Sequence, residues 1–429
     1  MAVHIPHGSL LALNWLTALG WLIALNWVWR VAIALRNLPG VPDLHDSKYA
    51  AIQTPAPPPP TAKAICVIVP ACNEQATIGE TLTSLLATEG VSLEIIAIDD
   101  RSTDETGKIM DAVAAGHASF NGGPLSGNSL RVIHIAELPE GWLGKPHAMA
   151  LAARQTNAEW LLFTDGDVFF TAETMRRSMN LLALKRGDHL VLYPTLILKS
   201  AGERMLMSCV QVLGIWMVRP WKIADPKAVS DSIGVGAFNL VRREAYSAVG
   251  GYESLRMEVL DDLRLGYKIK RAGYRQLVAF GPDMVRIHWG AGVRGLLNNL
   301  NKNAFAVFRY STPKLLASCL GLVVLSLLPF LVLIIGVVVT LAPGGRFSDF
   351  LVYGMPTFVQ LIAVWLLARY QRRYHGISPL FVLTFPVGVC LMLWAMVRSM
   401  IVTLKNGGVT WRGTLYPLSE LRRNAGPVR

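Results

Sequence analysis

The sequence predicts an α/β domain built on a mostly parallel sheet, with membrane-spanning helices before and after it. Between residues 64 and 312, short apolar runs of strand length alternate with stretches of helical pattern, and such alternation is typical of a parallel sheet with helices on both faces. Near both ends of the chain lie apolar runs of roughly 20 residues, which is enough to cross a bilayer.

The composition supports membrane segments. The chain of 429 residues is 52% hydrophobic and only 16% charged, and its mean hydropathy of +0.39 exceeds what a soluble domain needs. Its net charge of +12 suits a nucleic acid or an anionic membrane surface. Because so much of the sequence is apolar, we expect a membrane and no nucleic acid as partner. The five cysteines form no C-x-x-C pair, so neither a zinc site nor a disulfide framework is indicated.

The first apolar run extends from Leu10 to Val28, and Arg30 and Arg36 follow it. Basic flanks mark the cytoplasmic side of a membrane helix. We therefore predict a transmembrane anchor over residues 1–36, a stiff proline-rich linker over residues 37–63, and a cytoplasmic domain after them.

Four strands and two of the helices between them are predicted at the start of this domain. The strands are Ala64–Pro70, Leu93–Ile98, Leu130–Ile135 and Trp160–Thr164, and the helices are Asn73–Leu86 and Lys145–Gln155. In parallel sheets, ligands bind beyond the carboxyl ends of the strands. Polar residues follow three of these ends, at Asn73-Glu74, Asp99-Asp100 and Asp165-Gly166-Asp167. We expect these groups on one rim of the sheet, where they would hold a nucleotide.

Asp165 and Asp167 can face one ligand, because Gly166 permits the backbone to bend between them. Carboxylate oxygens suit Mg²⁺ or Mn²⁺, which binds one or two carboxylates together with substrate phosphates. The alternative is a solvated Asp-Gly turn that closes a strand.

A series of short motifs then follows in a fixed order between Ile65 and Trp289. They read V-I-V-P-A-C-N-E at 67–74, I-D-D-R-S-T-D at 98–104, G-K-P-H-A at 144–148, D-G-D at 165–167, G-V-G-A-F at 234–238, G-G-Y at 250–252 and D-D-L at 261–263. Each motif alone is loose, but the ordered series is specific. It resembles the family 2 inverting glycosyltransferases, and it implies a GT-A fold for residues 64–312.

The resemblance implies a nucleotide-sugar donor, with a UDP-sugar favoured. Asp100 matches the aspartate that binds the uracil ring, and Pro70, Asn73 and Glu74 would line the same pocket. Capping of the following segment is the alternative for Asp100. Lys145 matches the basic residue that reaches the donor diphosphate. As an ordinary exposed lysine it would stand at a helix start, where the helix dipole disfavours a cation.

The same resemblance implies a divalent cation, Mg²⁺ or Mn²⁺, as cofactor. Asp165 and Asp167 match the metal and ribose carboxylates. Both are candidate metal ligands, with Asp167 favoured over Asp165 as the direct one. His288 matches a histidine that approaches the diphosphate or metal in some members. A histidine satisfied within the fold is the alternative.

Asp262 matches the catalytic base of the family, and Asp261 precedes it. Inverting transfer to a hydroxyl needs one carboxylate within hydrogen-bond reach of that hydroxyl, opposite the departing diphosphate. The alternative is that the two aspartates cap a helix over Leu263–Lys270. Residues 294–310 contain no Q-x-x-R-W, the motif that often follows this aspartate in processive polysaccharide synthases, which makes that activity doubtful.

Three further apolar runs follow, at about Leu315–Leu341, Phe350–Ala368 and Pro379–Val397. We predict membrane helices over residues 313–404 and a basic tail over residues 405–429. Three crossings would place this tail outside, yet its charge favours the cytoplasm. Either the charge rule fails here, or one run is re-entrant or interfacial. Leu206–Val218 and Gly290–Tyr310 are candidates for interfacial helices or for core.

The tail contains G-V-T-W-R-G-T-L-Y at 408–416. This stretch resembles a juxtamembrane motif of lipid-modifying family members, namely ceramide-glucosyltransferase-like, carotenoid and hopanoid-associated enzymes. Arg412 would then bind the donor phosphates or close the site, unless the tail simply lies on anionic headgroups.

Together these features predict a multi-pass membrane glycosyltransferase of glycolipid biosynthesis, placed in a bacterial inner membrane, with a lipid acceptor. A polysaccharide synthase and a catalytically inactive membrane scaffold are the alternatives.

Overall fold

The computed structural model describes residues 7–50, 65–120, 127–290 and 292–427, which form two compact units. The helical unit comprises the chain up to Pro39 together with Leu198–Met217 and Gly290–Val402. The sheet unit comprises Gly40–Ile197, Val218–Trp289 and Thr403–Arg429. The basic tail therefore belongs to the same unit as the rim residues.

The sheet unit is built on a seven-stranded sheet with the strand order β3-β2-β1-β4-β8-β6-β9. The strands are β1 (Ile65–Ala71), β2 (Leu93–Asp100), β3 (Ser129–Ile135), β4 (Trp160–Phe163), β6 (His189–Tyr193), β8 (Asn239–Arg242) and β9 (Gln276–Phe280). Only β8 runs antiparallel to its neighbours, β4 and β6. The predicted mostly parallel α/β fold is thereby confirmed.

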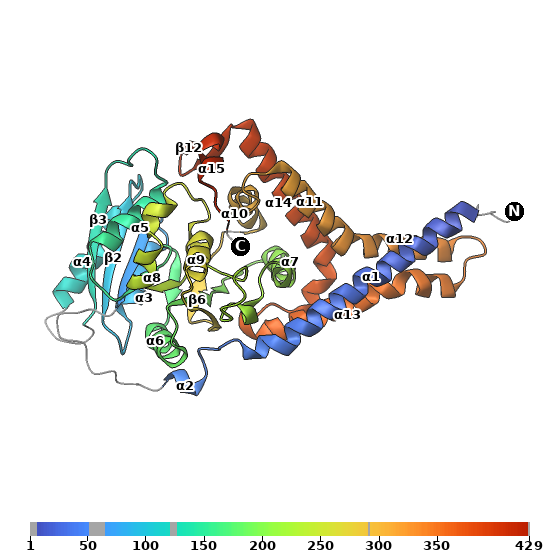
Figure 1. Cartoon of the computed structure of the whole chain (residues 1–429), viewed down its shortest axis with the longest axis horizontal. Helices are drawn as coiled ribbons and strands as arrows, with labels where there is room; N and C mark the ends of the chain where they lie inside the picture. Colours follow the sequence, from blue (N-terminus) through green and yellow to red (C-terminus); the bar gives the residue numbers. More distant parts are fainter. Residues whose placement is uncertain (1–6, 51–64, 121–126, 291, 428–429) are drawn as a thin grey trace. The chain divides into compact units, whose positions relative to one another are not determined.

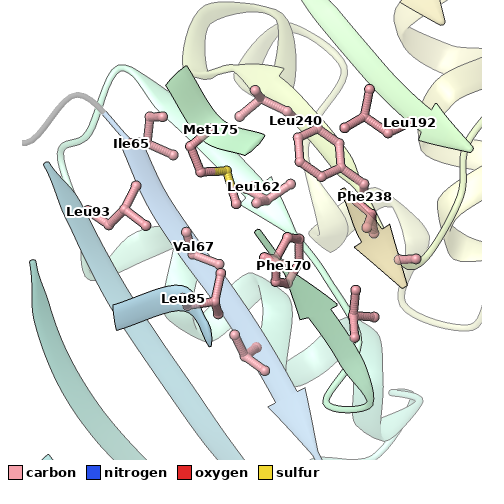
Figure 2. Packing of buried hydrophobic residues seen from close by; sticks show 14 of the residues in the cluster. Ile65, Val67, Leu85, Leu93, Leu162, Phe170, Met175, Leu192, Phe238 and Leu240 are labelled. Carbon is pink, nitrogen blue, oxygen red and sulfur yellow. The ribbon is translucent and has the colours of Figure 1, made fainter. Parts of the chain in front are cut away.

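Helices cover both faces of this sheet (Figure 1). They are α3 (Ile78–Leu86), α4 (Thr106–Phe120), α5 (Gly144–Arg154), α6 (Thr174–Lys185), α8 (Arg243–Ala248) and α9 (Asp261–Arg271), with the short α2 (Ser47–Ala50) before them. Successive side chains of β1 enter two different cores. Val67 packs in a cluster with Leu85 of α3 and Met175 of α6 (Figure 2), whereas Ile68 packs with Met149 of α5. Both faces of β1 are buried, as expected for a central parallel strand.

Two small sheets complete this unit. The first joins β5 (Val168–Phe170), β10 (Val285–Ile287) and β7 (Thr195–Leu196). The second is a hairpin of β11 (Gly408–Trp411) and β12 (Thr414–Pro417), followed by α15 (Leu418–Asn424). The hairpin turn consists of Arg412 and Gly413, with φ angles of 50° and 82°. A two-residue turn with both φ angles positive matches the right-handed twist of a hairpin, and it places Arg412 at the hairpin tip.

The helical unit contains α1 (His7–Asn37), α7 (Ala201–Met217), α10 (Gly292–Val307), α11 (Thr312–Leu322), α12 (Leu328–Leu341), α13 (Phe347–His375) and α14 (Phe385–Lys405). A π-helical turn over Val323–Leu327 joins α11 to α12, and a 3-10 turn over Pro379–Thr384 precedes α14. Among the described residues, four stretches are long and apolar enough to cross a membrane: Trp15–Gly40, Thr312–Leu341, Phe347–His375 and Pro379–Lys405. Candidate membrane helices thus lie near both ends of the chain, as the sequence predicts.

Helix α3 begins later than the sequence pattern predicts. It starts at Ile78 instead of Asn73. Asn73 has a left-handed φ of 58°, and its side-chain oxygen accepts a hydrogen bond from the Thr103 amide at 2.8 Å. These contacts with the loop after β2 hold residues 73–77 out of the helix.

We predict that Leu162→Ala lowers the free energy of unfolding by about 2–5 kcal/mol, because this fully buried β4 side chain leaves a cavity in the core. Chemical denaturation in detergent measures the loss. Leu184→Ala is the matched control, since Leu184 is 50% exposed on α6 and should change stability by less than about 0.5 kcal/mol. Equal effects of both changes would contradict the assigned core.

Candidate functional site

The loops after β1 and β2 form one continuous rim. The Asn73 amide donates to the Ser102 hydroxyl at 3.1 Å, and the Glu74 amide donates to the Thr106 hydroxyl at 2.8 Å. Pro70, the last but one residue of β1, pairs with Ile98 of β2. The rim residues expected after these two strands therefore come together.

Asp100 ends β2 with a buried carboxylate, which Arg101 clamps from the next position. The Arg101 Nε lies 2.8 Å from Asp100 Oδ1, and its Nη2 lies 3.3 Å from Oδ2. A Cβ added at Gly144 would lie 2.1 Å from the same Oδ2, so only glycine allows the start of α5 to approach so closely. The paired guanidinium of Arg101 is a site feature that sequence reasoning missed, although its adjacency to Asp100 was visible.

Lys145 joins three elements through its ammonium group. Its Nζ lies 2.5 Å from Asp165 Oδ1, beyond β4, and 3.9 Å from Asp261 Oδ2, in the first turn of α9. Burial disfavours the charged amine, but the attraction of Asp165, Asp261 and Asp262 outweighs it and raises the pKa of Lys145. Lys145 is therefore a buried, charged partner of the acidic residues and not an ordinary exposed lysine.

Asp261 and Asp262 occupy the first turn of α9, while Leu260 is its N-cap and makes no side-chain capping bond. Asp262 Oδ1 accepts a hydrogen bond from the Leu263 amide at 2.7 Å. Burial, together with the nearby charge of Asp261, raises the pKa of Asp262 to about 7. A carboxylate with this pKa can exchange a proton near neutral pH, as a general base must.

Two glycines of the G-V-G-A-F motif let its loop pack closely against the backbone of Asp262 and the carboxylate of Asp165. A Cβ at Gly234 would lie 1.8 Å from the Asp262 carbonyl oxygen, and a Cβ at Gly236 would lie 2.5 Å from Asp165 Oδ2. Larger residues at either position would push the loop away. The sequence showed this motif, but periodicity could not reveal what the glycines approach.

Asp167 lies beside β5, where strand register brings it toward His288. Burial and the charges of Asp165 and Glu74 raise the pKa of Asp167 to about 7. In the antiparallel pairing of β5 with β10, Val168 faces Ile287, so the next pair in the same register is Asp167 with His288. The His288 Nε2 is buried, and no described residue offers it a hydrogen bond.

The described residues contain no group of three or more histidine, cysteine or acidic side chains arranged to hold a metal ion. Asp165 is already paired with Lys145, whereas Asp167 and the His288 Nε2 are available as ligands. This donor set fits a hard divalent cation that takes its remaining ligands from bound phosphates and water.

The tail hairpin reaches the same rim. Arg412 Nη2 lies 3.4 Å from Glu74 Oε1, and the Tyr416 hydroxyl accepts a hydrogen bond from the Gly144 amide. The tail is also held by the Gly426 amide, which donates to Glu258 Oε2 at 3.1 Å. Arg412 is thus brought beside the expected donor pocket, and Tyr416 joins it there.

Comparison with known proteins agrees with the resemblance seen in the motifs. Residues 66–250 match the family described as Glycosyl transferase family 2. The chain is 22% identical over 369 residues to a 4,4'-diaponeurosporenoate glycosyltransferase of Staphylococcus aureus strain USA300, a match that covers 83% of this chain and 89% of the relative.

Solved structures were also found to be similar. A mannosyltransferase from Pyrobaculum calidifontis, in complex with GDP-Man and Mn2+, has 18% identity and a TM-score of 0.48, over 91% of this chain and 97% of its own. S. aureus TarS 1-349 with UDP-GlcNAc has 14% identity and a TM-score of 0.38, over 78% and 90%.

We predict that Lys145→Met destabilises the protein, and more so at pH 8 than at pH 5. Removing one partner of a fully buried ion pair costs about 3–5 kcal/mol, and the cost here is smaller because solvent screens the Asp165 side chain, which is 33% exposed. Without Lys145, the raised pKa values of Asp167 and Asp262 rise further. The folded state then binds more protons than the unfolded state from about pH 4 to above pH 7, so stability falls as pH increases.

Thermal unfolding in detergent at both pH values measures this effect. Lys108→Met is the matched control, because Lys108 pairs only with exposed Glu105 at 2.8 Å. If Lys145→Met lowers the unfolding temperature equally at both pH values, the proposed stabilisation of the ionised aspartates by Lys145 is wrong.

Proposed function

We propose that this chain, a glycosyltransferase whose residues 66–250 match the Glycosyl transferase family 2 model, transfers one sugar from a nucleotide donor to a lipid, with inversion. The proposed donor is a UDP-sugar. The observation that carries the proposal is the cluster of Lys145, Asp165, Asp261 and Asp262, in which Asp261 is buried and the others are partly exposed. This cluster adjoins Asp100 through the start of α5. It combines a cation for a diphosphate with a carboxylate that can act as base.

In the proposed donor site, the carboxylate of Asp100 accepts a hydrogen bond from the uracil ring, and Pro70, Asn73 and Glu74 line the pocket. Arg101 holds the Asp100 carboxylate in place through two hydrogen bonds. A carboxylate oriented in this way is preorganised for a planar base with an N–H donor.

Two cations serve the diphosphate. Lys145 is held in position by Asp165, whereas Arg412 stands at a hairpin tip, where it lies 3.4 Å from Glu74 and also interacts with Cys72. We propose that Arg412 turns from Glu74 to the donor phosphates when the donor binds. Arginine suits this role because its planar guanidinium binds phosphate in two-point contacts.

We propose Mg²⁺ or Mn²⁺ as cofactor, held by Asp167 with Asp165 and His288 nearby. The cation would neutralise charge that develops on the leaving diphosphate. Asp167, whose pKa is raised to about 7, becomes fully ionised when a cation binds, because the cation favours the charged carboxylate.

Asp262 is the proposed base that accepts the proton of the acceptor hydroxyl, and Asp261 with Lys145 sets its pKa. No covalent intermediate is needed, because one carboxylate and direct displacement suffice for inversion. An acceptor that is itself a carboxylate would already be ionised at neutral pH and would not need this base.

The lipid acceptor is supported by two findings. The chain has four helices apolar enough to cross a membrane, an arrangement that an enzyme with soluble substrates does not need. The S. aureus relative is named for 4,4'-diaponeurosporenoate, a carotenoid. The basic residues in the last turns of α1 and α13 support a cytoplasmic catalytic unit, and we propose a bacterial inner membrane.

The proposal is tested by UDP release from the purified, detergent-solubilised chain. A panel of nucleotide sugars is assayed with Mn²⁺ or Mg²⁺, with and without total membrane lipid. We expect UDP release only when donor, cation and lipid are all present. In a separate binding assay, Asp167→Ala should weaken metal-dependent UDP binding. Glu159→Gln is the control, because it removes an exposed carboxylate just before β4, at the opposite end of that strand from the rim.

Release without lipid would point to a soluble acceptor or to donor hydrolysis. No release with any donor, combined with no metal-dependent UDP binding, would instead support a catalytically inactive scaffold.

We predict that Asp262→Asn reduces transfer by about 10²–10⁴-fold, because the amide cannot accept the proton, while UDP affinity stays near that of the unchanged protein.

In the unchanged protein, transfer should rise with pH through about 7, where Asp262 ionises. Asp261→Asn should shift this rise to lower pH, because it removes the charge that opposes ionisation of Asp262. Initial rates and UDP titrations measure both effects, and unchanged turnover in Asp262→Asn would remove it as base.

A further inference from the structure

The position of the tail restricts how the chain can cross the membrane. Arg412 contacts Glu74, the Gly426 amide contacts Glu258, and Arg264 bonds to the Pro427 carbonyl. These contacts lie within the sheet unit, so the tail is on the same side of the membrane as the catalytic residues. The number of crossings between Trp289 and Thr403 must therefore be even, although three apolar stretches lie between them.

Helices α1, α12 and α13, which lie in three of the candidate membrane spans, pack together as a bundle. In α12 and α13, the Thr357 hydroxyl bonds to the Pro329 carbonyl, and Gly336 packs against Tyr353, so these helices run antiparallel. In α1, Gly20 lies against Pro356 of α13. Both helices also reach one carbonyl oxygen, that of Leu325, through Trp27 at 2.8 Å and Gln360 at 3.5 Å. Helices α1 and α13 therefore run parallel.

The basic ends of this bundle coincide. Arg36 lies in the last turn of α1, and Arg372 and Arg373 lie in the last turn of α13. Because α1 and α13 are parallel, these residues mark one end, which the charge rule assigns to the cytoplasm. The C-terminal end of α13 is therefore on the cytoplasmic side, which is also the side of the tail. If α14 crossed the membrane, it would place the tail on the opposite side.

Helix α14 packs elsewhere in the same unit. A Cβ added at Gly388 would lie 2.6 Å from the Cys209 Cβ of α7, and the Ser399 hydroxyl accepts from the Phe305 amide of α10 at 3.1 Å. Figure 1 shows α14 turning away from the direction shared by α1, α12 and α13. Its partners α7 and α10 lie in the two stretches for which the sequence predicts either interfacial helices or core.

The outer face of α14 matches a membrane surface in its chemistry. Val387, Trp394 and Ile401 are spaced by seven residues and about half exposed, at 52%, 49% and 53%, so they form one apolar stripe. Beside this stripe, α10 and α14 enclose a groove of about 390 Å³, lined in part by Arg294 and Arg398. Arg398 lies over the Trp394 ring at 5.0 Å, and both arginines are exposed.

We infer that α14 lies along the cytoplasmic surface of the bilayer instead of crossing it, and that Arg294 and Arg398 bind the anionic lipid headgroups of that surface. The apolar stripe enters the acyl boundary, while the two guanidinium groups remain at headgroup level. This arrangement satisfies both the even number of crossings and the basic charge of the tail.

Site-directed labelling tests the topology. The only exposed cysteine among the described residues is Cys390, so Cys390→Ser provides a background without reactive thiols. Single cysteines are then placed at Ala342, between α12 and α13, at Arg372, at the end of α13, and at Asn406, after α14. Each is treated with a membrane-impermeant maleimide in intact spheroplasts and again after lysis.

We expect Ala342→Cys to react in intact spheroplasts, and Arg372→Cys and Asn406→Cys to react only after lysis. Reaction of Asn406→Cys in intact spheroplasts would show that α14 crosses and would overturn the inference. Reaction of Ala342→Cys only after lysis would also overturn it, because α12 and α13 would then not cross as a hairpin.

Lipid binding tests the role of the groove. The double change Arg294→Gln, Arg398→Gln should lower the affinity for phosphatidylglycerol by about tenfold or more, as measured by native mass spectrometry of the full chain. The control is Lys108→Gln with Arg154→Gln, which removes two exposed cations of the sheet unit. Equal affinity for phosphatidylglycerol in both double variants would overturn the proposed contact between the two arginines and the headgroups. Neither experiment depends on sugar transfer, so their failure is distinguishable from failure of the proposed function.

Discussion

The ammonium group of Lys145 is the interaction on which the rest of the site depends. Asp165, Asp261 and Asp262 arise from the end of β4 and the start of α9, and like charges gathered in a buried region repel one another strongly. A cation placed at the start of α5 offsets this repulsion. The position is unfavourable for the helix dipole, so the carboxylates, and not the helix, account for a lysine there.

Close backbone approach makes that cluster possible. Gly144 brings the start of α5 against Asp100, and Gly234 and Gly236 bring their loop against Asp262 and Asp165. A side chain at any of these positions would overlap a carboxylate or a backbone carbonyl. The glycines of two separate motifs therefore have one shared function, which is to let three loops converge around few charged atoms.

The tail hairpin links catalysis to membrane topology. Its two-residue turn presents Arg412 to Glu74, and its Tyr416 accepts a bond from Gly144. A segment that supplies a donor-binding cation must lie on the catalytic side of the bilayer. The same contacts thus complete the proposed donor pocket and limit the number of times that the preceding helices can cross.

Local patterns in the sequence were sufficient to predict the parallel sheet, the polar residues at its rim and the apolar helices at both ends, because burial and strand length leave their periodicity in neighbouring residues. The ordered motifs also indicated the family. The tertiary structure alone decided that α3 begins at Ile78, that Arg101 clamps Asp100, that Lys145 pairs with Asp165, and that Arg412 meets Glu74 across 338 positions. These features depend on loop conformation and on contacts between distant segments, for which no local periodicity exists.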